Sequence, residues 1–125
     1  MLTDITQDVL SSAMDAIALR GRAINNNIAN VETPGYQRQD IAFEAALRTA
    51  LDTGQYDPEQ QPDLATVVPA VVNDASSPAR ENGNNVDADA EMAKLAENTL
   101  RYQAIIEAMT SKNALLKTAI YEGKK

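Results

Sequence analysis

Apolar side chains recur at alternating intervals of three and four residues through the first part of the chain, residues 2–31. Two neighbouring stripes follow this spacing: Leu2, Ile5, Val9, Ser12, Ala16, Leu19, Ala23, Asn26 and Asn30, and beside them Leu10, Met14, Ile17, Gly21, Ile24, Ile28 and Val31. An α-helix places residues three and four apart on one face. The pattern therefore predicts one long helix in the N-terminal segment, 1–33.

A third stripe with the same spacing lies near the other end of the chain: Met92, Leu95, Thr99, Tyr102, Ile106, Met109, Asn113, Leu116 and Ile120. Before it stands Asp87, a residue type that accepts hydrogen bonds at helix N-termini, and Asp89 and Glu91 suit the positive end of a helix. Gly123 offers a C-cap. We expect a second long helix in the C-terminal segment, 86–125.

The segment that follows the first helix, 34–51, opens with a proline that disfavours a helical conformation at the residue before it. Its Pro-Gly pair fits the central positions of a type II turn. A shorter amphipathic helix is predicted over Ile41–Leu51, where Glu44 and Arg48 are spaced to pair. The sequence thus predicts a turn and then a short helix.

The middle segment, 52–85, is rich in Pro, Gly, Asn, Asp and Ser, and is expected to be mostly loop. One island within it, Ala65–Val72, has the β-branched content of a strand, but Pro69 removes a ladder donor. We interpret the island as an edge strand or an extended docking segment. The predicted fold class is mainly α, with two long terminal helices around a polar, loop-rich or partly extended middle.

Composition argues against catalysis and against nucleic-acid binding. The chain has no cysteine and no histidine, so thiolate sites and the commonest general base are missing. Segment 52–85 holds six acids and one base, so it carries −5 of the net charge of −7, and no basic patch remains for phosphate backbones. The acidic run 81–89 lacks the ligand spacing of a calcium loop. We predict no catalytic residue, no metal site, no cofactor and no small-molecule substrate.

The N-terminus has neither a basic start nor an uninterrupted apolar run, so neither a cleavable signal peptide nor a membrane span is expected.

Asparagines occupy three positions of the stripes: Asn26, Asn30 and Asn113. A buried asparagine in a helical seam weakens it but fixes register and partner, because an unpaired amide there costs about 1–3 kcal/mol. Alternatively, these residues lie at the water-exposed edge of an ordinary intramolecular hairpin. Because Ala and Ser fill many stripe positions, one hairpin alone would bury little apolar surface, and neighbouring molecules would have to add stability.

Two stretches resemble the flagellar rod/hook proteins. They read NNIANVETPGYQRQDIAFEAAL near the start and NNVDADAEMAKLAENTLRYQAIIEAMTSKNALLKTAI near the end. The first looks like the signature that the whole family shares. The second, with its Arg-Tyr-Gln block, is similar to the FlgB family of proximal rod proteins, whereas the related FlgC family usually has Ser-Tyr-Gln.

The resemblance implies a structural subunit of the bacterial flagellar rod that transmits torque from motor to hook across the periplasm. It implies self-association and contact with other rod subunits and with the basal-body and export-gate base of the rod, after export through the flagellar type III apparatus. The terminal helices would form a coiled-coil hairpin in the assembly and be largely disordered in the free monomer. The expected assembly signature is Asn26, Asn27, Ile28, Asn30, Thr33, Pro34, Gly35 and Tyr36. The expected seam is Leu19, Ile24, Leu95, Tyr102, Ile106, Met109, Asn113, Leu116 and Ile120.

Two other functions remain open from the sequence: a FlgC-type rod protein, and a helical adaptor or export chaperone that never polymerises. A cooperatively melting, fully helical monomer would favour the adaptor.

Overall fold

The computed structural model of the chain describes residues 2–53 and 67–123. Within these ranges lie helix α1 (Leu2–Ala29), strand β1 (Gln39–Ala42), helix α2 (Glu44–Thr53), strand β2 (Ala70–Asn73) and helix α3 (Ala88–Glu122). The mainly α class predicted from the sequence is confirmed. Much of the predicted middle segment, including Ala65 and Thr66 of its β-branched island, lies outside the described residues.

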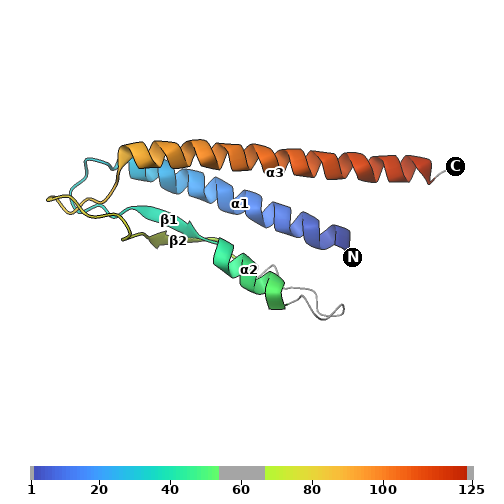
Figure 1. Cartoon of the computed structure of the whole chain (residues 1–125), viewed down its shortest axis with the longest axis horizontal. Helices are drawn as coiled ribbons and strands as arrows, with labels where there is room; N and C mark the ends of the chain where they lie inside the picture. The colour runs from blue at the N-terminus through green and yellow to red at the C-terminus, as the bar shows by residue number, and fades with distance from the viewer. Residues whose placement is uncertain (1, 54–66, 124–125) are drawn as a thin grey trace.

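The two terminal helices lie side by side and run in opposite directions (Figure 1). Asn98 of α3 lies opposite Ile17 of α1, to whose carbonyl oxygen its amide nitrogen donates a hydrogen bond of 3.0 Å. Since α1 begins 15 residues before Ile17, α3 passes the start of α1 near Asn113. The last turns of α3 therefore extend beyond its partner helix.

A tight turn redirects the chain after α1. The Tyr36 N–H donates to the Thr33 carbonyl oxygen at 3.3 Å, and Gly35 has a φ of 73°. This conformation suits glycine because it carries no Cβ, and it places Pro34 and Gly35 at the centre of the turn. The Pro-Gly turn predicted from the sequence is thus present, and it starts the return path along α1.

Strands β1 and β2 form an antiparallel pair in which Ile41 faces Val71 and Asp40 faces Val72. The prediction of a helix from Ile41 is therefore wrong at its start, because Ile41 belongs to β1 and the helix begins at Glu44. Ile41 is buried in the strand and packs in the apolar core. The strand therefore places this apolar side chain in the interior, as a helix was expected to do.

Pro69 immediately precedes β2 and does not interrupt it. The Asp74 N–H donates to the Arg38 carbonyl oxygen at 2.8 Å. Together with the register, this bond shows which residues of β2 direct their N–H and C=O groups toward β1. Residues 70, 72 and 74 then direct their backbone groups toward β1, while 69, 71 and 73 direct theirs away. The missing N–H of proline costs no ladder bond, and the edge strand predicted from the island is present over Ala70–Asn73.

The apolar core is thin and lies between α1 and the antiparallel pair of strands β1 and β2, which is called the hairpin below. Its buried members are Ala16, Ala23, Ile41, Phe43 and Val67. Asp87 caps α3 as predicted, because its side chain accepts hydrogen bonds from the N–H groups of Asp89 and Ala90. Gly123 stands at the C-cap and donates to the Ala119 carbonyl oxygen.

Candidate functional site: a buried polar junction and an exposed helical stripe

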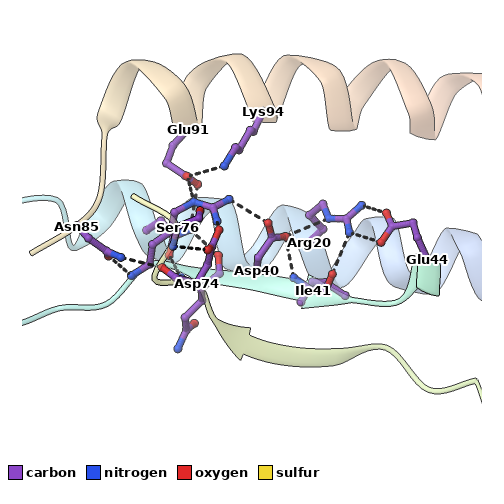
Figure 2. Close-up of polar contacts among 12 residues, drawn as sticks. Arg20, Asp40, Ile41, Glu44, Asp74, Ser76, Asn85, Glu91 and Lys94 are labelled. Atoms are coloured by element: carbon purple, nitrogen blue, oxygen red, sulfur yellow. Dashed lines mark hydrogen bonds and ion pairs between the residues drawn. The ribbon is translucent and has the colours of Figure 1, made fainter. Parts of the chain in front are cut away.

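Arg38 is the centre of a buried polar junction that joins α1, the hairpin and the start of α3. Its side chain is only 2% exposed, and it bonds three carboxylates from three parts of the chain: Glu91 at 2.5 Å, Asp40 at 3.1 Å, and Asp74. In Figure 2, Glu91 reaches down from α3 while Asp40 and Asp74 approach from the hairpin side. A buried cation is tolerated when its donors are all used.

Asn27 completes the junction from α1 and is fully buried. Its amide nitrogen donates to Glu91 at 2.9 Å and to the Gln39 carbonyl oxygen at 2.8 Å. Its amide oxygen accepts from the Gln39 N–H at 2.9 Å and from the Tyr36 hydroxyl at 3.2 Å. All four hydrogen-bonding positions of the side chain are therefore used, and the helix is tied to the first strand.

Two further asparagines hold the loop before α3 in place. Asn84 donates to the carbonyl oxygens of Asn30 and Thr33, both at 2.8 Å, and so satisfies backbone acceptors at the end of α1. Asn85 accepts from the Arg38 N–H and donates to the Asp74 carbonyl oxygen. Its amide is thus inserted at the end of the β1–β2 ladder, in the place of a direct bond between the strands.

A second ionic cluster lies further along α1. Arg20 bonds both oxygens of Glu44, at 2.6 and 2.9 Å, and reaches Asp40 at 3.3 Å and the Ile41 carbonyl oxygen at 3.0 Å (Figure 2). Arg101 of α3 approaches Glu44 at 3.7 Å. The predicted partner of Glu44, Arg48, is replaced by these residues, because the helix start places Glu44 against α1.

The charges of the two clusters support one another. Burial opposes the charge of Arg38, but hydrogen bonds to Glu91 and Asp40 outweigh it and raise the guanidinium pKa. Burial also opposes the charge of Asp40, yet hydrogen bonds from the Ile41 N–H and Arg38 lower its pKa. Hydrogen bonds from Arg20 lower the pKa of Glu44. These shifts favour the charged forms of Arg38, Asp40 and Glu44, so the ion pairs hold the three parts of the chain in a fixed geometry.

Asn98 is the polar contact between α3 and the middle of α1. It is buried, its amide nitrogen donates to the Ile17 carbonyl oxygen, and its amide oxygen has no partner within the described residues. A Cβ on Gly21 would lie 3.4 Å from the same amide nitrogen, so the glycine leaves room for Asn98. A buried asparagine at one level of a helix pair favours a single register.

Some residues of the expected assembly signature are buried in the polar junction, whereas others are exposed. Asn27 and Tyr36 enter the junction, and Asn30 contributes its carbonyl oxygen to Asn84. Asn26 is exposed in this chain, and the buried face of α1 continues through Ala23 to Asn27 instead, so the expected role of Asn26 in assembly stays a prediction. Ile28 is half-buried and Thr33, Pro34 and Gly35 are exposed in the turn.

The side of α3 that faces α1 overlaps only in part with the stripe that the sequence predicts. The residues that are buried or half-buried on this side are Glu91, Leu95, Asn98, Ile105, Met109 and Lys112. Leu95 and Met109 belong to the predicted seam. Its other members, Tyr102, Ile106, Asn113, Leu116 and Ile120, are exposed, whereas Leu19 of α1 is half-buried and Ile24 is buried. The apolar stripe is therefore wider than the contact that α1 makes with it.

Sequence reasoning missed Arg38, Glu91, Asn84, Asn85 and Asn98. Charged and amide residues are usually placed on the surface, and only their partners, far away in sequence, make their burial possible.

Comparison with known proteins gives a consistent set of relatives. The chain is 33% identical to the flagellar basal body rod protein FlgB of Bacillus subtilis (strain 168), with 92% of each protein covered. It is 34% identical to FlgB of Cereibacter sphaeroides over 91% of the chain and 94% of the relative. It is 30% identical to FlgB of Escherichia coli (strain K12) over 78% and 80%. No family model matches. Of the described helices, none combines the length and hydrophobicity that crossing a membrane requires.

Proposed function

Because this chain belongs to the FlgB family of flagellar basal body rod proteins, we propose that it is a structural subunit of the bacterial flagellar rod. It polymerises through its terminal helices, contacts other rod subunits and the export-gate base of the rod, and transmits torque from motor to hook. It reaches its place in the basal body, across the periplasm, by flagellar export. The FlgB name of the relatives favours this function over that of FlgC and over an export chaperone.

The observation that supports polymerisation is the uncovered edge of the α3 stripe. Ile106 is 38% exposed and Tyr102 is 40% exposed, so the described chain covers this edge of α3 only in part. Leu116 and Ile120 lie past the start of α1, and Ile120 is 60% exposed. Burying apolar area releases about 25 cal/mol per Å², so a neighbouring helix laid along this edge would be stabilised.

The junction supports the mechanical part of the proposal. Arg38 joins residues of the hairpin and of α3, and Asn27 joins α1 to both. Each connection is directional and at least partly buried, so the three parts of the subunit are held in one arrangement at this end. A subunit that transmits torque needs such an arrangement, because a slipping helix pair would dissipate the applied load.

The proposal can be tested with two substitutions on different faces of α3. Ile106→Asp places a charge on the uncovered edge, whereas Leu100→Asp changes an apolar residue that is 66% exposed on the far face. In cells that depend on the variant for flagellar assembly, we expect Ile106→Asp to abolish rod formation and swimming and Leu100→Asp to permit both. Circular dichroism of the two purified proteins should be alike. Swimming by the Ile106→Asp strain, or equal loss with Leu100→Asp, would contradict this interface.

A further inference from the structure

The loop that precedes α3 contains an Asn-Gly pair, Asn82–Gly83, at an exposed tip. Gly83 has a φ of 81°, and its N–H donates to the Arg80 carbonyl oxygen at 2.8 Å. The side-chain oxygen of Asn82 accepts from the Asn84 N–H at 3.1 Å, and its carbonyl oxygen accepts from the Gly35 N–H at 2.8 Å. The pair is therefore part of the contact between the two loops at this end of the molecule.

The fold itself requires this pair of residue types. A Cβ on Gly83 would lie 3.4 Å from Cα of Gly35, and the positive φ strains any other residue. Asn82 must supply a short side-chain acceptor for Asn84. An asparagine followed by glycine is also the least hindered pair for cyclisation, because no side chain shields the glycine nitrogen.

We propose that Asn82 is a site of spontaneous deamidation and that the folded loop holds the reaction back. The backbone nitrogen of Gly83, after losing its proton to solvent base, attacks Cγ of Asn82. The new N–Cγ bond forms, the Cγ–Nδ2 bond breaks, and ammonia leaves with a proton from water. Hydrolysis of the cyclic imide at either carbonyl then gives aspartate or isoaspartate at position 82. Water is the only co-reactant.

The folded loop opposes both movements that this reaction needs. The Gly83 N–H is engaged by the Arg80 carbonyl oxygen, and the Asn82 side chain is engaged by the Asn84 N–H. Attack therefore requires the loop to open locally, so the rate in the folded chain is the open-loop rate multiplied by the fraction of time that the loop is open. An unfolded chain has no such protection.

The product would damage the polar junction. In isoaspartate the main chain passes through Cβ and Cγ of residue 82, which adds one carbon before Gly83 and turns the carbonyl that accepts from the Gly35 N–H into a carboxylate side group. Asn84 must stay in register to bind the carbonyl oxygens of Asn30 and Thr33. Aspartate leaves the main chain unchanged but adds a charge. The isoaspartyl form should therefore unfold at lower denaturant concentration than the aspartyl form.

The test follows ammonia release and peptide masses of the full chain in mildly alkaline buffer, with and without urea. In urea, Asn82 should react before Asn113, which is followed by alanine. In the folded chain, its reaction should be at least about tenfold slower. Asn84→Ala, which removes the side-chain bonds to the end of α1, should accelerate it, while the exposed control Asn26→Ala should not.

Equal deamidation rates at Asn82 in the folded chain and in urea would overturn the proposal that the folded loop slows the reaction. A rate in urea no higher than that of Asn113 would overturn the site itself, and neither comparison depends on a variant folding correctly.

Discussion

At the scale of single residues, the contrast between Asn26 and Asn27 separates a surface amide from one that holds the fold. Asn27 makes four hydrogen bonds in a fully buried position, whereas the side chain of Asn26 points to solvent. Asn27→Ala leaves the backbone of Gln39 unsatisfied, so we expect unfolding free energy to fall by more than about 2 kcal/mol. Asn26→Ala should change it by less than about 0.5 kcal/mol. Urea unfolding of both variants measures the difference; equal effects would refute the role of Asn27.

Arg38 offers a second residue-scale prediction. Arg38→Met keeps much of the side-chain volume but removes the nearer cation of Glu91, which is 1% exposed and then retains only Lys94, at 3.8 Å. Removing one partner of a buried ion pair costs about 3–5 kcal/mol, so the variant should be destabilised by that amount. The exposed Arg48→Met is the matched control and should remain near the stability of the original chain. The measurement is the guanidinium chloride concentration at the unfolding midpoint of the original chain and of the two variants. An Arg38→Met protein as stable as the original chain would refute the central role of Arg38 in the junction.

At the scale of elements, helix periodicity predicted the two long helices, and residue types predicted the caps of α3, but neither fixed which edge of each stripe faces inward. On α3, Leu95 and Met109 belong both to the predicted stripe and to the side that contacts α1. The polar residues Glu91 and Asn98 determine which side faces α1, because their hydrogen-bond partners lie on α1. Local sequence contains no information about such partners. The strand β1 was missed for a similar reason, since Ile41 fits a helix stripe equally well until β2 pairs with it.

The ionic contacts between α1 and the hairpin predict how stability depends on pH. The folded-state pKa values of Asp40, Glu44 and Asp74 are lowered, the last chiefly by hydrogen bonds from Ser76. Their contribution is therefore complete above the unfolded-state pKa of about 4 and is lost as pH falls through the folded values. Unfolding free energy should decline from about pH 5 downward.

Arg20→Gln reduces two of these contributions, because Arg20 is the main cause of the lowered pKa of Glu44 and also helps to lower the pKa of Asp40. Urea midpoints at a series of pH values should fall less steeply for this variant than for the original chain. Identical slopes would show that the contact between Arg20 and Glu44 contributes nothing to the acid response.

At the scale of the whole molecule, order is unevenly distributed along the long axis. The end with the turn and the loops (Figure 1) contains the C-terminal end of α1 and the start of α3. The polar junction and the N-cap of α3 belong to this end, whereas the thin apolar core includes Ala16 and Phe43. The other end contains the part of α3 that passes α1, with Leu116 and Ile120 exposed. An isolated helix of about ten residues is only marginally stable in water, so this end depends on contacts from other molecules.

Hydrogen exchange of the dilute chain should reveal this gradient. We expect amides of α3 near Asn98 to be protected by the contact with α1, and those beyond Asn113 to exchange almost as fast as in an unfolded chain, since only helix propensity protects them. On assembly into a polymer the same amides should become protected, because neighbouring subunits would then cover Leu116 and Ile120. Strong protection up to Glu122 in a monomer would instead indicate a helix that is stable by itself, which is the property of a closed adaptor and would count against polymerisation through this end.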